Sequence, residues 1–242
     1  MESRVESSKK LAAKCAVDDH VTSGLRIGVG TGSTARYMIE YLKEKVDSEQ
    51  LQNITCVPTS FRSRQMLIEN GLAVHCLDQT YELDICIDGA DEVDSHLNCI
   101  KGGGGCLTQE KVVMSCARDF VIVGDFRKRS KRLGTWYPTI PIEVVPAAYL
   151  AVKTKVESQE GGVCELRMGK NQFVPFITDN MNYILDWNFP KLEYPLEALN
   201  IRLKLISGIV ETGLFLGNAR VAYFGLEDGR CVRLGRTDTH ED

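Results

Sequence analysis

The fold is decided by a short apolar segment, Leu83-Asp-Ile-Cys-Ile87, that runs directly into Asp88-Gly-Ala-Asp-Glu92. The hydrophobic and β-branched residues of this segment predict a short buried strand. Asp88 and Asp91 then follow the carboxyl end of the strand, which is where open α/β sheets bind their ligands. The segment therefore predicts an α/β fold with a ligand site at this edge of the sheet.

Residues 101–110 add an ammonium group, a glycine run and a further carboxylate. Lys101 precedes four consecutive glycines, and Glu110 follows them. A glycine run has no side chains to pack and loses backbone entropy when ordered, so it favours a backbone that approaches a ligand closely. Its N–H groups are then free to bind oxyanions. Together these groups predict an enzyme that acts on a small phosphorylated polyol.

Composition narrows the class of protein. The chain has 242 residues, of which 43% are hydrophobic and 26% charged, as expected for a soluble globular protein of one or two domains. The net charge of −4 argues against nucleic acid as a partner, and the basic cluster at 127–132 is the one exception. No apolar run approaches the roughly 20 residues of a membrane span. The polar N-terminus, with two glutamates in residues 1–10, fits neither a secretory signal nor a transit peptide.

Cysteine and histidine placement argues against a metal site. The nine cysteines form no C-x-x-C pair. The four histidines, which are His20, His75, His96 and His240, show no ligand spacing with them. Scattered cysteines without a signal peptide indicate a reducing compartment, so we expect a cytoplasmic protein without a bound metal.

The first half of the chain alternates strands with helices. We expect helices at 5–20, after the loop 30–34, at 60–69 and after a cap at Thr108, and strands at 25–29, 54–57, 73–76, 83–87 and 120–123. This alternation predicts a Rossmann-like, doubly wound parallel sheet. We assign it to residues 1–137 together with 221–242, because the closing strands at 221–224 and 231–234 could return to it.

A second pattern begins after about residue 138. We expect strands at 140–145, 163–168 and 210–215, two strand-like pieces at 173–177 and 183–187, and helices at 147–156 and 196–205. The β-α-β-β-α-β order is that of a small ferredoxin-like α+β domain, which we assign to residues 138–220.

The loop Gly28-Val-Gly-Thr-Gly-Ser-Thr34 resembles a dinucleotide-binding turn, but it lacks the third glycine of G-x-G-x-x-G. The next strand is followed by Pro58-Thr-Ser60 rather than by an acid for a ribose hydroxyl, and the Lys-Ser/Thr pair of a P-loop is absent. What remains is a glycine turn at a helix N-terminus, which suits an anion. The alternative is a plain helix cap by Ser33 or Thr34.

Six motifs occur in a family-specific order and spacing. They are Gly30-Thr-Gly-Ser-Thr34, Pro58-Thr-Ser60, Asp88-Gly-Ala-Asp-Glu92, Lys101-Gly-Gly-Gly104, Leu107-Thr-Gln-Glu-Lys111 and Thr178-Asp-Asn180. Through them the chain closely resembles the type A ribose-5-phosphate isomerases over nearly its whole length. The resemblance implies a cofactor-free aldose–ketose isomerase of the pentose phosphate pathway, which interconverts ribose 5-phosphate and ribulose 5-phosphate. It also implies a Rossmann-like domain, a ferredoxin-like domain and a homo-oligomer, either dimer or tetramer.

The resemblance also implies roles for individual positions. Substrate contacts fall on Thr31, Gly32, Ser33, Thr34, Asp88, Gly89, Ala90, Asp91, Lys101, Gly102, Gly103, Gly104 and Lys128. Glu110 matches the catalytic base, with Asp88, Asp91 and Lys101 as further catalytic groups. Lys10 matches a lysine that some members place near the phosphate, or it belongs to a solvated helix face.

The chain departs from the family pattern in three places. Val123-Gly-Asp125 stands where Ile-Ala-Asp is expected, and Arg127-Lys128 stands where Ser-Lys is usual. The phosphate-binding charge could therefore come from a neighbour of Lys128, namely Arg127, Arg129 or Lys131. Met181 occupies the position of a usual glycine.

The implied reaction sets requirements for these residues. It removes the C2 proton, stabilises an enediolate and returns the proton at C1, and one carboxylate can shuttle that proton. Glu110 would do so from the start of a helix, unless it is a surface glutamate stabilised by the helix end. Because a helix N-terminus lowers a carboxyl pKa, a base here needs opposing desolvation. Lys101 and the following amides would hold the oxyanion, unless Lys101 is an exposed loop lysine.

The carboxylates Asp88 and Asp91 would bind sugar hydroxyls, and one of them would take the O1 proton when the furanose ring opens. The alternative for Asp91 is a turn or cap residue.

Two other functions compete with an isomerase. A non-enzymatic sugar-phosphate effector module would carry an N-terminal helix-turn-helix and lack the base, whereas only about 24 residues precede the first expected strand and Glu110 is present. An acyl-CoA transferase of related fold would use a glutamate as a nucleophile and would need a longer chain or a second subunit to bind coenzyme A, and the sequence shows no such segment. We therefore expect the isomerase.

Overall fold

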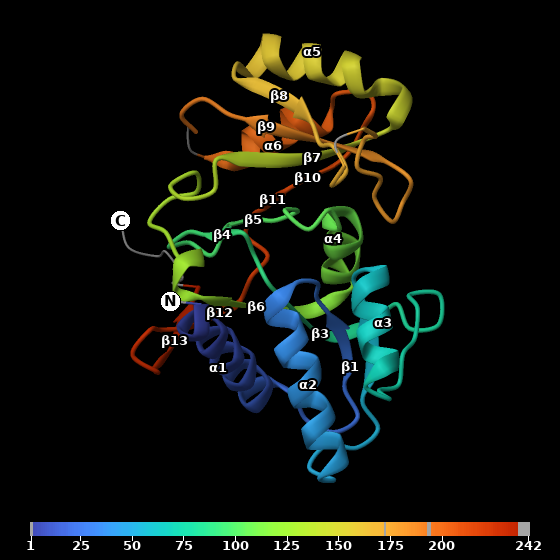
Figure 1. The fold of residues 1–242 in the computed structure, drawn as a ribbon, viewed down its shortest axis with the longest axis vertical. Coiled ribbons are helices and arrows are strands. Elements are labelled where there is room, and N and C mark those ends of the chain that lie inside the picture. The colour runs from blue at the N-terminus through green and yellow to red at the C-terminus, as the bar shows by residue number, and fades with distance from the viewer. Residues whose placement is uncertain (1, 172, 193–194, 237–242) are drawn as a thin grey trace.

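The computed structural model describes residues 2–171, 173–192 and 195–236 and has the α/β architecture expected from the sequence (Figure 1). Six strands form the main sheet in the order β13-β12-β6-β3-β1-β2. They are β1 (Arg26–Val29), β2 (Thr55–Pro58), β3 (Leu83–Asp88), β6 (Ala117–Asp125), β12 (Val221–Gly225) and β13 (Cys231–Gly235). Neighbouring strands are parallel except for the antiparallel edge pair β12–β13. The predicted parallel sheet is therefore confirmed, with one antiparallel edge strand.

Helices cover both faces of this sheet. Three of them, α1 (Glu2–His20), α2 (Ser33–Asp47) and α3 (Phe61–Glu69), pack on one face, and α4 (Leu107–Ser115) packs on the other. Along β6 the side chains alternate, so that Val121 and Val123 join the core with α1 and α2, whereas Phe120 and Ile122 join the core with α4. This period of two is the pattern of a strand that is buried on both faces.

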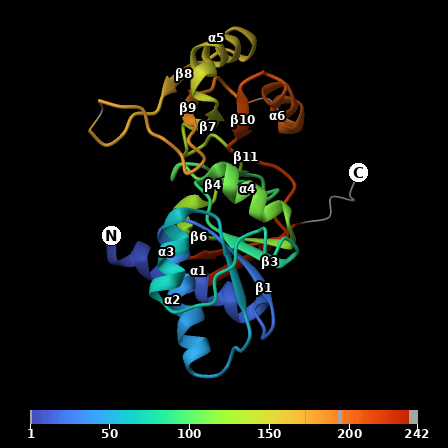
Figure 2. The same ribbon diagram turned by 90° about the vertical axis from the view of Figure 1, so that its right-hand side faces the viewer.

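A smaller antiparallel sheet lies beyond α4, and Figure 2 shows it with its two helices apart from the main sheet. Its order is β10-β7-β9-β8, with β7 (Thr139–Val144), β8 (Val163–Leu166), β9 (Tyr183–Asn188) and β10 (Ile209–Thr212). Helices α5 (Tyr149–Glu160) and α6 (Leu196–Lys204) share one apolar core with this sheet. The chain order β7-α5-β8-β9-α6-β10 confirms the ferredoxin-like arrangement.

A third sheet of very short strands lies between the other two (Figure 1). It consists of β4 (Glu92–Val93), β5 (Cys99–Ile100) and β11 (Leu214–Phe215), in the order β11-β5-β4. Each strand has two residues, which is too short for a periodic sequence signal. The sequence did not predict this sheet.

Three expected strands differ in the structure. Residues 73–76 form only an isolated bridge from Val74 to Cys56, and residues 173–177 form a loop with one bridge from Pro175 to Met168. A proline has no N–H to donate, so it opposes a continuous ladder there. The strand expected at 210–215 is split at Gly213, whose carbonyl accepts from the Lys101 N–H at 2.9 Å. Among the described residues no helix is long and apolar enough to cross a bilayer.

Candidate active site

The candidate site lies where the connections of the main sheet change direction. Strands β1 and β3 are neighbours, yet the chain leaves β1 for β2 on one side and leaves β3 for β6 on the other. Such a switch point opens a crevice at the carboxyl ends of the two strands, where open α/β sheets bind ligands. The loop 30–34 follows β1 and the loop 89–91 follows β3, so both predicted motifs meet there.

A cavity of about 130 Å³ opens at this edge of the sheet. It is lined by Thr31, Gly32, Ser33, Thr34, Gly89, Ala90, Asp91, Lys101, Gly102, Gly104, Glu110 and Lys128, all of which the sequence placed in the site. The other two predicted residues, Asp88 and Gly103, are not in the lining but contact residues that are. The cavity is smaller than the roughly 300–1,000 Å³ of pockets for drug-sized ligands, which favours a small substrate.

Asp88 has a structural role at the edge of the site, where it connects two loops. Its side chain is buried, and Oδ1 accepts the Thr31 N–H at 2.9 Å and the Gly89 N–H at 2.7 Å. A side chain at position 30 would place its Cβ 2.0 Å from the same oxygen, so only glycine fits there. The carboxyl group therefore ties the loop after β1 to the loop after β3.

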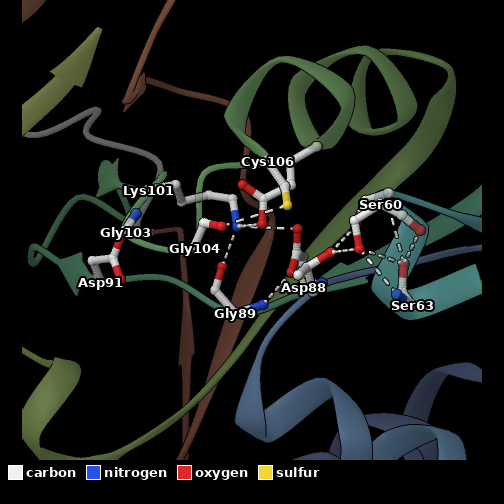
Figure 3. A network of polar contacts seen from close by, with 12 residues as sticks. Ser60, Ser63, Asp88, Gly89, Asp91, Lys101, Gly103, Gly104 and Cys106 are labelled. Atoms are coloured by element: carbon white, nitrogen blue, oxygen red, sulfur yellow. Dashed lines mark hydrogen bonds and ion pairs between the residues drawn. The ribbon is translucent and has the colours of Figure 1, made fainter. Parts of the chain in front are cut away.

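Lys101 is the centre of the polar network (Figure 3). Its ammonium nitrogen lies 3.0 Å from Oδ2 of Asp88 and 3.2 Å from Oε1 of Glu110, and it donates to the Gly89 carbonyl. The side chain is 3% exposed, so it is not the exposed loop lysine of the alternative interpretation. Burial opposes the charged form, but the two carboxylates outweigh burial and raise the pKa of Lys101. Lys101 therefore provides a persistent positive charge inside the cavity.

Glu110 is buried and lies beside that charge, so it is not the surface glutamate of the alternative interpretation. Burial raises the pKa of Glu110 to about 8, even though Lys101 acts in the opposite direction. This is the desolvation that a base at a helix N-terminus needs. Oε1 accepts from Lys101, whereas Oε2 is buried and accepts no hydrogen bond from any described residue. One carboxyl oxygen of a cavity-lining glutamate is thus left without a hydrogen-bond partner among the described residues.

The start of α4 differs from expectation. The helix begins at Leu107, its N-cap is Cys106, and no side chain caps it. The predicted cap at Thr108 is wrong, because the Thr108 hydroxyl lies inside the first turn and donates to Oε2 of Glu143 at 2.7 Å. A capping side chain accepts from the backbone, whereas this hydroxyl donates to a distant strand.

The glycine run is used in two ways. Gly102 and Gly105 have φ angles of +103° and +81°, which favour glycine, and side chains there would collide with Leu107 and Phe176. The Gly103 N–H donates to Oδ2 of Asp91 at 2.7 Å (Figure 3), so the expectation that all these N–H groups are free is wrong. Within the described part of the chain, no residue accepts from the N–H of Gly104, which lines the cavity.

The part of the cavity that the start of helix α2 lines suits an anion. Helix α2 has Gly32 as its N-cap and no side-chain cap, so the expected alternative of a cap by Ser33 or Thr34 is wrong. The first-turn N–H groups of a helix without such a cap are open to an anion. Lys128 lines the same cavity as this helix end, whereas Lys10 is exposed on α1 and does not line it. Arg127 is held by Asp125, with contacts of 2.7 and 3.0 Å.

Metal ligands do not cluster in the described residues. No three His, Cys, Asp or Glu side chains there are placed to hold a metal ion, and His240 lies outside the described residues.

Comparison with known proteins identifies the family. Residues 55–229 match the family Ribose 5-phosphate isomerase A (phosphoriboisomerase A). The chain belongs to this family. The ribose-5-phosphate isomerase of Homo sapiens is 48% identical over 228 residues, which cover 94% of this chain and 73% of that protein. The probable ribose 5-phosphate isomerase of Caenorhabditis elegans is 46% identical, over 98% of this chain and 95% of its own length.

Solved structures of the family share the fold. A D-ribose-5-phosphate isomerase in complex with phospho-erythronic acid matches with a TM-score of 0.91 and 40% identity, over 96% of this chain and 99% of that one. The ribose 5-phosphate isomerase from Plasmodium falciparum matches with a TM-score of 0.90 and 34% identity, over 98% and 100% of the two chains. The predicted fold class is confirmed.

The departures from the family pattern have local explanations. A side chain at position 124 would place its Cβ 3.3 Å from the Lys128 side chain, so the alanine that is usual there would need only a small shift of that lysine. Met181 has a φ of +63°, the left-handed region in which glycine is favoured. The usual family glycine is therefore explained by the turn, and the methionine is strained.

Several residues near the cavity received no site role from the sequence, although Pro58-Thr-Ser60 is one of the six family motifs. The hydroxyls of Thr59 and Ser60 lie 2.9 and 2.7 Å from that of Thr31. Both follow the carboxyl end of β2, beside β1, so strand order would have located them. By contrast, Arg167 directly follows β8 in the small sheet, and it donates to the carbonyl of Gly102 at 2.9 Å. Only the tertiary fold places this arginine next to the glycine run.

Proposed function

We propose that this protein is an aldose–ketose isomerase that interconverts D-ribose 5-phosphate and D-ribulose 5-phosphate, as its family name implies. The observation that carries the proposal is the pairing of Glu110 with Lys101 inside the cavity. Glu110 has a raised pKa and one oxygen without a partner, and Lys101 supplies a positive charge 3.2 Å from the other oxygen. A base and an oxyanion stabiliser in contact are what enediolate chemistry requires.

The phosphate is placed at the N-terminus of α2. Backbone N–H groups there, the hydroxyls of Ser33 and Thr34, and the ammonium of Lys128 provide donors of the right kind. Binding at this end directs the sugar toward the glycine run and Glu110, which line the same cavity. The energy of phosphate binding then helps to orient C1 and C2.

Proton transfer is assigned to Glu110. In the open-chain aldose its free oxygen removes the C2 proton, and the C–H electron pair forms the C1–C2 double bond while charge moves onto O1. The ammonium of Lys101 and the N–H of Gly104 stabilise this enediolate. Return of the proton to C1, with transfer of a proton from O2 to O1, gives the ketose.

Ring opening is assigned to the pair Asp88 and Asp91. Asp91 lines the cavity with Oδ2 fixed by the Gly103 N–H, which suits contact with sugar hydroxyls. Asp88 lies beneath Lys101. Either carboxylate can take the O1 proton of the furanose while the C1–O4 bond breaks, and it then returns that proton to O4, which becomes a hydroxyl. Asp91 has the direct access.

The family assignment supports the enzyme and not the non-enzymatic effector module. We further propose that the protein acts in the non-oxidative pentose phosphate pathway in the cytoplasm, as a homo-oligomer that is a dimer or a tetramer. Light scattering on the purified protein measures the oligomeric state. We propose domain boundaries at 137/138 and 220/221, which separate the two sheets.

The decisive experiment combines the proposed substrate with a chelator. The purified protein is incubated with ribose 5-phosphate in excess EDTA, and ketose formation is followed. We expect full turnover, because the proposed chemistry uses only side chains and backbone amides. Absence of turnover would reject the proposed substrate, and turnover that EDTA abolishes and zinc or magnesium restores would reject the cofactor-free mechanism.

A further inference from the structure

Glu143 on β7 is a fully buried carboxyl outside the cavity, and it receives three hydrogen bonds. The Thr108 hydroxyl donates to Oε2 at 2.7 Å. The Thr178 hydroxyl and the Asn182 amide donate to Oε1, both at 2.9 Å. A buried carboxyl needs such donors, so these side chains are fixed relative to one another.

The three donors come from two segments that are far apart in the sequence. Thr108 lies in the first turn of α4, two residues before Glu110. Thr178 and Asn182 belong to the turn 178–182 that leads into β9. Around Glu143 the small sheet, this turn and the start of α4 are therefore joined at one carboxyl group.

The same turn makes two further contacts with the helices of the site. The Asp179 carboxyl accepts the N–H of Phe61, the first residue of α3, at 2.8 Å, and the Asn180 amide oxygen accepts from Gln109 of α4 at 3.2 Å. Both contacts are exposed. Together with the hydrogen bonds of the buried Glu143, they hold the turn 178–182 against the starts of α3 and α4.

Helix α4 depends on such contacts because its own start is weak. It has nine residues and no side-chain cap, and it follows a glycine run. An isolated helix of this length is only marginally stable in water. The position of its first turn therefore depends on the tertiary contacts of Thr108 and Gln109. The position of Glu110 depends on the same contacts.

We propose that Glu143 is a positioning residue that acts through Thr108 to hold Glu110 beside Lys101. The proposal rests on the proposed function of Glu110 as the base. Glu143 does not line the cavity and contacts no reacting atom, so its effect falls on the chemical step rather than on sugar binding. A misplacement of about 1 Å in a catalytic group lowers rates by about 10²-fold.

The test compares two substitutions at one position. Thr108→Val keeps the shape and removes the hydroxyl, and Thr108→Ser keeps the hydroxyl. We expect Thr108→Val to lower kcat for ribose 5-phosphate by about 10- to 100-fold with KM within about threefold. Thr108→Ser should stay within about threefold of the unmodified protein in both constants. Equal losses in the two variants, or a loss confined to KM, would overturn the proposal.

Two further variants separate positioning from general stability. Asn182→Ala removes a hydrogen bond to Glu143 without touching α4, and it should lower the Tm with little change in kcat. In Glu143→Gln, the glutamine oxygen can take the place of Oε1 and accept from the Asn182 NH₂ group and the Thr178 hydroxyl. The glutamine NH₂ group then faces Thr108, whose hydroxyl can accept as well as donate. We expect this variant to keep kcat within about threefold. A kcat loss in Asn182→Ala as large as in Thr108→Val would contradict the proposal.

Hydrogen exchange gives a readout that does not depend on the substrate. Amides at the start of α4, including Glu110, which donates to the Cys106 carbonyl at 3.0 Å, should exchange faster in Thr108→Val and not in Thr108→Ser. Unchanged exchange would overturn the positioning role whatever the activity. Faster exchange in a protein that shows no isomerase activity would instead reject the proposed function and leave the contact between Glu143 and α4 supported.

Discussion

The ammonium nitrogen of Lys101 lies 3.2 Å from a carboxyl oxygen of Glu110, and both side chains are buried. Two effects on the pKa of Glu110 oppose each other, because burial raises it and the charge of Lys101 lowers it. The net pKa is raised, so Glu110 is a stronger base than an exposed glutamate. Because Lys101 keeps its charge, the enediolate that forms has a counter-charge already in place.

Replacement of the base tests this arrangement directly. Glu110→Gln keeps the size of the side chain and removes the basic oxygen. General base catalysis contributes about 10²–10⁴-fold, and the other carboxylate among the described residues that line the cavity, Asp91, already accepts the Gly103 N–H. We expect kcat to fall by at least about 10³-fold with a modest change in KM, because the sugar can still bind. Steady-state kinetics with ribose 5-phosphate measure both constants.

Proton exchange at C2 in deuterated water is the control for this variant, because exchange and turnover need the same base. Both should disappear together. Exchange at a rate near that of the unmodified protein would place the base elsewhere, and Asp88 or Asp91 would be the next to replace.

The pH dependence of kcat/KM reports the pKa of Glu110 in the free enzyme. A base must be deprotonated to act, so activity is lost as the pH falls through its pKa. With that pKa raised to about 8, we expect an acid limb at neutral to weakly alkaline pH. A solvated glutamate would instead give a limb near 4.3, and the substrate phosphate contributes separately near about 6. Rates measured from about pH 3.5 to 9 distinguish these values, and a limb below 5 would refute the burial argument.

The lining of the cavity could be predicted because of where its residues lie on the sheet. Thr31 and Asp91 follow the ends of two strands, and the carboxyl ends of neighbouring parallel strands meet at one edge. Lys101 and Glu110 belong to the loop and the helix that come next in the chain after Asp91. Residues that are close in the sequence are therefore also close in the cavity. Gly30 is explained in the same way, since the backbone there must pass close to Asp88.

The support of the cavity could not be predicted, because it comes from long-range contacts. Glu143 and Arg167 belong to the small sheet and its flanking loop, and nothing in the local sequence indicates that they reach α4 or the glycine run. Thr108 was predicted as a helix cap because of its residue type and place in the sequence. The hydrogen bond to a strand residue 35 positions away overrides that local preference.

Lys128 should provide most of the side-chain charge at the phosphate end. Hydrogen bonds to charged groups contribute about 1.5–3 kcal/mol, so Lys128→Ala should raise KM by about 10- to 100-fold. Arg129→Ala is the matched control, because Arg129 is exposed and outside the cavity lining, and its KM should change by less than about twofold. A larger effect at Arg129 than at Lys128 would reverse the assignment.

Arg127 should behave differently from Lys128. Its guanidinium makes two hydrogen bonds to the buried Asp125, and these lower the pKa of that carboxyl against the effect of burial. Arg127→Ala should therefore lower the Tm and leave KM for ribose 5-phosphate within about threefold. Thermal unfolding and kinetics on the same preparation check both parts, and a raised KM with an unchanged Tm would assign Arg127 to the phosphate.

Met181 offers a test of backbone strain away from the chemistry. A side chain in the left-handed region costs about 1–2 kcal/mol, whereas glycine loses about 0.5–1 kcal/mol more backbone entropy on folding. Met181 has a φ of +63° and is 70% exposed, so Met181→Gly removes strain and little packing. We expect the Tm to rise by about 1–3 °C. Met168→Gly, at an exposed methionine outside that region, should lower the Tm, and a fall in both variants would show that the turn at Met181 is not strained.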